Sequence, residues 1–175
     1  MFSRAPWRVL PLLILVVAAW GCTPEATEDP RVSAERKKFL LQQEPSGALT
    51  LTDAAQTVPI QPEVTLVGQI TAGELDPFQE NQASFVISEA PEGGHGGPDH
   101  ADDCAFCRRR QAKAPKAAIR LVDVDGKVLP IDARKLLQVE KGDVVVVTGN
   151  AQYDATLNQL NIEATGVYVR ERPKS

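Results

Sequence analysis

Histidine, cysteine and aromatic residues are all scarce in this chain of 175 residues. It contains two His and three Cys, and Phe, Trp and Tyr together make up 5% of it. No segment holds the roughly 20 apolar residues in a row that a transmembrane helix needs. The chain also lacks a nucleophile elbow, a phosphate-binding loop, HExxH and GxGxxG, which excludes the enzyme classes built on those motifs. We therefore expect a non-catalytic protein.

The longest apolar run lies at the amino terminus and is typical of a secretion signal. Arg4 and Arg8 precede residues 9–19, which are interrupted only by Pro11. This run is too short to span a bilayer but fits the apolar core of a signal peptide. Residues 1–21 are therefore predicted to direct export.

The sequence Ala-Trp-Gly-Cys at residues 19–22 resembles the lipobox of bacterial lipoproteins. In that family the cysteine becomes the lipid-modified first residue, so the resemblance implies a lipid on Cys22 that anchors the protein to a membrane. The protein would then lie in the cell envelope and face the periplasm or the exterior. The alternative is a plain secretory peptide in which Cys22 is incidental.

Residues 22–62 are predicted to form a flexible tether. Residues 23–31 are acidic and rich in proline, which favours an extended, solvated segment. A short helix is expected from Ser33, a candidate N-cap, and one short strand at residues 49–52. We expect this arm to connect the lipid to a single domain.

After this arm the pattern changes to β. Apolar, strand-like segments lie at residues 64–73, 83–90, 117–132, 141–150 and 155–170. Gly68 predicts a bulge or bend in the first strand, and Asp125-Gly126 is the signal for a tight hairpin. Asp132 is a candidate N-cap for a short helix over residues 132–139.

The order of three strands, a short helix and two strands resembles that of the OB-fold, a Greek-key barrel. The long first strand bent at Gly68 carries the resemblance, together with residues 136–169, where a short helix leads to Gly-Asp, a valine-rich strand and a β-branched last strand. The resemblance implies an all-β domain with small α content, a five-stranded barrel over residues 63–170. Residues 171–175 would be a tail.

The barrel resembles the OB domains of nucleic-acid-binding proteins, but its charge does not suit that ligand. Residues 63–170 hold 11 Lys and Arg residues against 16 Asp and Glu residues, a net charge of −5. Single-stranded nucleic acid is bound by a basic groove with stacking aromatic residues. We therefore expect an envelope protein or a small ligand as the partner, and not nucleic acid.

An insertion of residues 91–116 separates the second and third strands, where a hairpin needs only about 2 to 5 residues. It holds both histidines of the chain, His95 and His100, and the pair Cys104 and Cys107. Two thiolates and two imidazoles can surround Zn²⁺ as a tetrahedron, and Cu⁺ accepts the same ligands. The spacing predicts a metal site with four protein ligands, which is structural or metal-carrying because it leaves no open position.

Asp99, Asp102 and Asp103 lie among these ligands. Carboxylates in such places accept hydrogen bonds from metal-bound imidazoles and hold them in position. We expect that role for them, with replacement of one imidazole as a metal ligand as the alternative.

Two further interpretations use the same cysteines. The sequence Cys-Ala-Phe-Cys at residues 104–107 resembles the Cys-x-x-Cys of thiol oxidoreductases, whose thiolates nearby cations stabilise. In an oxidising compartment the pair would instead close as a purely structural disulfide. Both alternatives leave the two histidines incidental.

One basic cluster follows the cysteines. It consists of Arg108, Arg109, Arg110, Lys113 and Lys116. Such a run is most often a solvated face, and it also suits contact with an anionic partner or lipid headgroups. The sequence as a whole predicts an exported, lipid-anchored binding module with a metal-binding loop.

Overall fold

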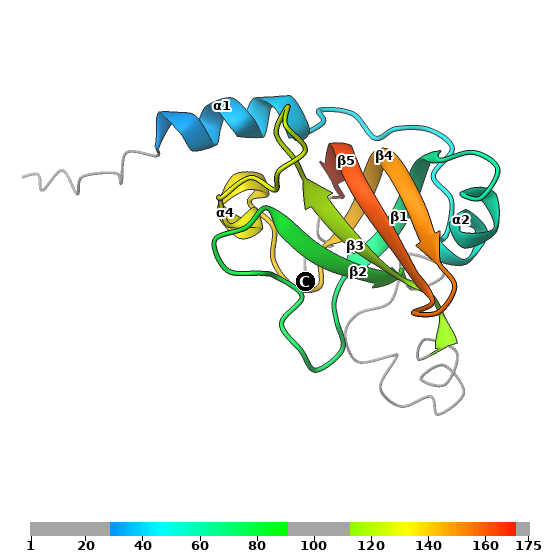
Figure 1. The fold of residues 1–175 in the computed structure, drawn as a ribbon. Helices are drawn as coiled ribbons and strands as arrows, with labels where there is room; N and C mark the ends of the chain where they lie inside the picture. The colour runs from blue at the N-terminus through cyan, green and yellow to red at the C-terminus, as the bar shows by residue number, and fades with distance from the viewer. Residues whose placement is uncertain (1–28, 91–112, 171–175) are drawn as a thin grey trace, which may run out of the picture.

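The computed structural model describes residues 29–90 and 113–170 of the chain (Figure 1). The elements run in the order α1 (Pro30–Phe39), α2 (Leu51–Thr57), β1 (Glu63–Ile70), β2 (Ser84–Glu89), β3 (Lys116–Leu121), α4 (Ala133–Leu137), β4 (Val144–Asp154) and β5 (Gln159–Val169). Four of the five strands begin and end within four residues of the segments expected from the sequence. The third, β3, ends at Leu121, whereas the expected segment continued through the Asp125-Gly126 turn to residue 132.

The strands form one closed barrel in the order β1-β2-β3-β5-β4, with β4 paired back to β1. The β3–β5 contact is parallel, and the other four contacts are antiparallel. Closure gives every strand two neighbours, so no strand is an edge strand along its whole length. The expectation of a mainly β domain built as a five-stranded barrel is confirmed.

Two glycines allow the strands to approach closely. A Cβ on Gly68 would lie 2.8 Å from Cδ1 of Ile87 and 2.9 Å from the carbonyl oxygen of Ser88, at the point where β1 begins to pair with β2. A Cβ on Gly149 would collide with the carbonyl oxygen of Glu163 on β5. Next to Gly149 the β4–β5 register shifts by one residue, so that Thr165 is the extra residue of a bulge.

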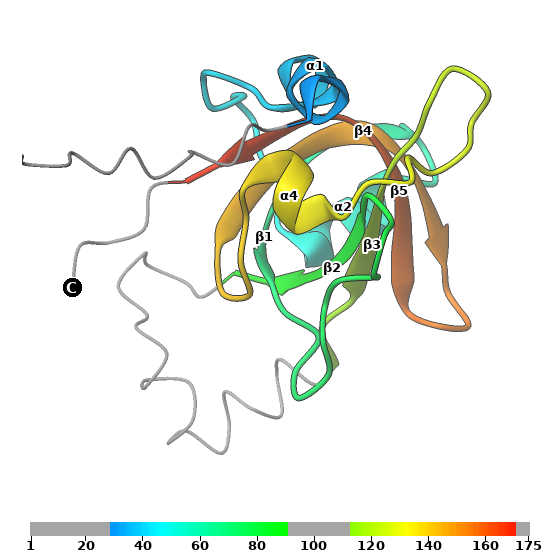
Figure 2. The same cartoon turned by 90° about the vertical axis from the view of Figure 1, so that its left-hand side faces the viewer.

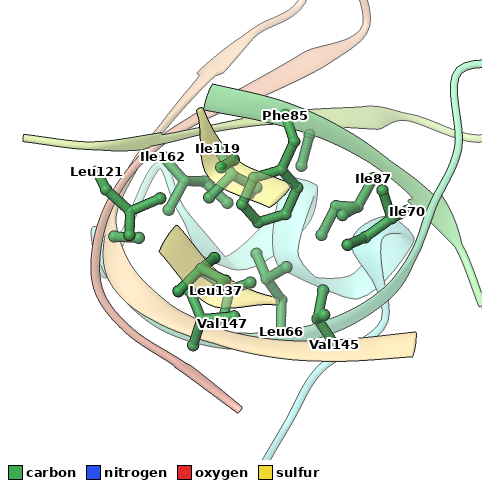
Figure 3. Packing of buried hydrophobic residues seen from close by; sticks show 14 of the residues in the cluster. Leu66, Ile70, Phe85, Ile87, Ile119, Leu121, Leu137, Val145, Val147 and Ile162 are labelled. Carbon is green, nitrogen blue, oxygen red and sulfur yellow. The ribbon is translucent and has the colours of Figure 1, made fainter. Parts of the chain in front are cut away.

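The barrel interior is filled by alternate side chains of the five strands. The pattern is clearest in β1, where every second residue from Val64 to Ile70 is buried. Figure 3 shows Leu66, Phe85, Ile119 and Ile162 converging from different strands on the same interior. These side chains are almost completely excluded from solvent, so the barrel has a packed core.

A short helix closes each end of the barrel. Figures 1 and 2 show α4 at one end and α2 at the other. Leu136 and Leu137 of α4 and Leu51 and Ala54 of α2 are all buried in the same hydrophobic core as the strands. The barrel and its two end helices therefore form one packed unit.

The local signals of the second half of the chain are confirmed. Asp132 caps α4, and its side chain accepts a hydrogen bond from the backbone N–H of Arg134. The hairpin after β3 turns at Gly126, which has a φ of +75° that suits glycine. The Asp123 carboxylate accepts from the N–H groups of Asp125 and Lys127 and fixes that turn.

The structure differs from the expected tether over residues 29–62. Helix α1 begins at Pro30 with Asp29 as its N-cap, earlier than the expected start at Ser33. In place of the strand expected at residues 49–52, Thr50 caps the helix α2. Leu51, Ala54 and Val58 are three and four residues apart, so a helix buries all three on one face.

Residues 40–50, here called the strap, connect α1 to α2. Leu41 donates its N–H to the carbonyl oxygen of Val167 on β5, and Leu49 bonds to Thr65 and Val67 on β1. Since β4 lies between β5 and β1 in the barrel, the strap crosses β4. The contact at Val167 lies beyond the part of β5 that pairs with β3. The contacts at Thr65 and Val67 lie before the part of β1 that pairs with β2. The strap thus covers the strand edges that the barrel itself leaves open.

Candidate functional site

The predicted metal site lies outside the described residues. This applies to the ligands His95, His100, Cys104 and Cys107, and to Asp99, Asp102 and Asp103 beside them. It also applies to the predicted lipidation site Cys22 and to Arg108, Arg109 and Arg110 of the basic cluster. Lys113 and Lys116 are described, and both are exposed. The base from which the insertion projects is therefore the part of this site that the structure defines.

The two ends of the insertion leave the barrel side by side. Strands β2 and β3 pair as antiparallel neighbours, and Ile87 opposite Ala117 is the pair nearest to the insertion. Because two hydrogen-bonded strands lie about 5 Å apart, the connection starts and finishes at nearly the same point of the barrel. A loop closed in this way brings residues near its two ends close together.

Hydrogen bonds fix both sides of this base. On the β2 side, the Glu89 carboxylate accepts from the backbone N–H of Thr52 at 3.3 Å and from its hydroxyl at 3.2 Å. On the β3 side, the Asn158 side chain donates to the carbonyl oxygen of Lys113 at 3.0 Å. The Tyr153 hydroxyl in turn donates to the Asn158 carboxamide oxygen at 2.9 Å. The base of the insertion is thus held by hydrogen bonds to α2 on one side and to the β4–β5 turn on the other.

A second feature is a groove of about 740 Å³ on the outside of the barrel. Thr65, Thr148 and Thr165 lie on three adjacent strands that line it, and the hydroxyls of Thr148 and Thr165 are 3.3 Å apart. The strap forms one wall, and residues 57–63 form another. The rest of the lining is Gly47, Leu49, Thr57, Gln61, Glu63, Val64, Gly149 and Asn150.

The groove offers hydroxyl and amide groups, and its lining contains a single charged side chain, that of Glu63. It can form hydrogen bonds with a polar ligand but presents no nucleophile activated by a base. No local sequence pattern indicates this groove, because Thr65 on β1 lies more than 80 residues before Thr148 and Thr165. The alternation of the strands places these threonines outward, but only the pairing of β1, β4 and β5 brings them together.

A cluster of charged groups lies at the α4 end, away from the base of the insertion. Arg134 donates to the Asp132 carboxylate at 2.6 and 2.9 Å, and its guanidinium lies 5.3 Å from the centre of the Phe78 ring. The hydrogen bond from Arg134 lowers the pKa of Asp132 below its ordinary value near 3.8, and raises the pKa of Arg134. In this cluster Asp132 caps α4, and Arg134 contacts Asp76 and Phe78 of the β1–β2 loop.

Residues 29–90 and 113–170 contain no group of three or more His, Cys, Asp or Glu side chains placed to hold a metal ion. None of the helices in these two ranges is both long and apolar enough to cross a membrane. No protein-family model and no curated protein matches the chain.

Proposed function

We propose that this protein is an exported, lipid-anchored binding module of the cell envelope that holds Zn²⁺ or Cu⁺ in the insertion between β2 and β3. The ligands are His95, His100, Cys104 and Cys107. The observation that carries the proposal is the base of the insertion, where paired strands bring both ends of the connection to one fixed point. The metal would either stabilise one conformation of the loop or be carried by it, and the protein would not catalyse hydrolysis.

The barrel in this proposal is of the OB type. Three observations support that assignment: the strand order β1-β2-β3-β5-β4, the parallel pairing of β3 with β5, and the position of α4 between β3 and β4. Its interior is packed with side chains, so a ligand or partner would be bound on the outside of the barrel or on the insertion. A fold of this type does not by itself fix the ligand.

The metal is tested on the mature chain carrying Cys22→Ser, purified with and without reductant and analysed for bound elements. We expect about one equivalent of Zn or Cu per chain, as a single four-ligand site requires. Both Cys104→Ser and His95→Ala should lose it, and Lys127→Ala, an exposed change in the β3–α4 hairpin, should retain it.

Other outcomes would identify the alternatives. Thiols that cycle with a dithiol reductant, while His95→Ala has no effect, would replace the metal site by a redox pair. A metal-free protein with a closed Cys104–Cys107 bond and no redox cycling would leave only a structural disulfide. The lipid anchor is tested separately: a high-salt wash, which screens charge contacts, should release the Cys22→Ser chain from the membrane fraction but not the acylated chain.

A further inference from the structure

Helix α1 presents a basic surface on the outside of the barrel. It packs on α4 and β5 and buries only Phe39. Its exposed side carries Arg31, Lys37 and Lys38, and Lys135 is exposed on the neighbouring helix α4. These four residues are here called the α1 basic face.

The orientation of this face is fixed by the one cation of α1 that points inward. Arg36 donates to the carbonyl oxygens of Leu136 at 2.7 Å and Lys135 at 2.6 Å. These carbonyls lie at the carboxyl end of α4, where backbone acceptors lack partners within the helix. A guanidinium bonded to two of them holds α1 in one position relative to the barrel.

Nearby carboxylates neutralise the α1 basic face only in part. Glu35 is paired with Lys38 at 2.7 Å, and the Asp29 side chain caps the helix by accepting from the backbone N–H of Arg31. On α4, Asp132 is bonded to Arg134, which is not counted in the face. Among the residues that the structure describes, these four cations with two adjacent carboxylates leave an excess of positive charge; Glu25 and Glu28, which precede the helix in the sequence, lie outside this count.

The proposed lipid anchor would hold this face near a membrane. Between Cys22 and the start of α1 lie residues 23–29, and seven residues span at most about 25 Å when fully extended. Electrostatic attraction decays over about 8 to 10 Å at physiological salt. A tether of this length lets α1 come within that distance of the surface, where lysine and arginine each add to binding to anionic headgroups.

We infer that the α1 basic face binds the anionic headgroups of the membrane to which the protein is anchored. This contact turns the α4 end of the barrel toward the lipid. The base of the insertion adjoins α2, at the opposite end (Figures 1 and 2). The base of the insertion then lies on the side of the barrel away from the membrane. The inference rests on the proposed anchor for its setting, but the charge contact can be measured without the lipid.

The test uses the mature chain with Cys22→Ser and sedimentation with vesicles. Equal parts of phosphatidylglycerol and phosphatidylcholine are compared with pure phosphatidylcholine. We expect binding to the anionic vesicles alone, which weakens with added salt and falls about tenfold or more in Arg31→Glu/Lys37→Glu. The matched control is Lys113→Glu/Lys116→Glu, which makes the same change of charge at the base of the insertion, away from α1, and should alter binding by less than about twofold.

Three results would overturn the inference: no binding of the unsubstituted chain, equal losses in the two double variants, or loss in the control pair alone. The last would place the contact at the base of the insertion. Circular dichroism of each variant checks that it is folded. Acylation and metal content are determined by other measurements. The proposed function can therefore be disproved while the membrane contact is confirmed, and the membrane contact can be disproved while the proposed function is confirmed.

Discussion

The two ends of the barrel are closed in similar ways by helices from different parts of the chain. Helix α4 lies between two barrel strands, whereas α2 comes from the segment before β1. Both are short, both have a polar N-cap, and both bury their leucines completely or almost completely. The folded domain therefore begins before the first strand. The segment upstream of β1 is as much a part of the core as the helix inside the barrel.

Removing the whole segment before β1, which contains α1, the strap and α2, should have the largest effect on stability. A chain that begins at residue 63 should lose about 5 kcal/mol or more, because Phe39, Leu51 and Val58 each contribute about 1.5 to 3 kcal/mol by burial. Since domains are stable by only about 5 to 15 kcal/mol, this chain should be largely unfolded. Urea unfolding measures the loss, with a chain that begins at residue 29 as the control. A barrel starting at residue 63 with unchanged stability would show that α2 is dispensable.

Single substitutions in α2 and α4 test whether both helices are needed to close the barrel. Leu51→Ala in α2 and Leu137→Ala in α4 should each destabilise the protein by about 2 to 5 kcal/mol, because both side chains are buried and each change leaves a cavity. Leu157→Ala, at an exposed position in the β4–β5 turn, should stay within about 0.5 kcal/mol of the unsubstituted chain. Thermal and urea unfolding provide the values. A negligible loss in Leu51→Ala alone would mean that only α4 closes the barrel.

The smallest expected effects distinguish the two N-caps. Thr50→Ala and Asp132→Ala should each cost about 1 kcal/mol at neutral pH. The bond from Arg134 lowers the pKa of Asp132 in the folded state, so its stabilisation is complete above the ordinary value near 3.8 and disappears as the pH falls through the lower folded value. The Thr50 hydroxyl does not titrate in this range.

Unfolding measured from neutral to acid pH checks this contrast. The difference between Asp132→Ala and the unsubstituted chain should shrink in acid, and that for Thr50→Ala should persist. An equal loss from Asp132→Ala at every pH would contradict the charge-assisted cap.

Local signals account for what could be predicted about the fold. Alternation marked the strands, Asp125-Gly126 marked the hairpin, and Asp132 marked the start of α4, since each depends on residues adjacent in sequence. The helix α2 was missed because Thr-Leu-Thr suggests a strand and the prolines on either side suggest a linker. Its apolar face gains stability only by packing against strands that follow it in the chain.

The features of the candidate site divide in the same way. The four possible metal ligands are apparent from their spacing in the insertion and remain a prediction. The threonine-lined groove could not be read from the sequence, because Thr65, Thr148 and Thr165 become neighbours only through strand pairing. The bonds from Arg36 to the end of α4 join residues about a hundred positions apart, so no local pattern could indicate them.

The strands, the turns and the gathering of histidine and cysteine in one insertion can be recognised in the sequence, because those properties depend on neighbouring residues and on composition. The segments that close the barrel, the strand edges that the strap covers and the outward side of α1 are apparent only in the folded protein. Burial, edge pairing and helix capping at a distance each require two parts of the chain to meet. Their free energy exists only once the barrel has brought those parts together.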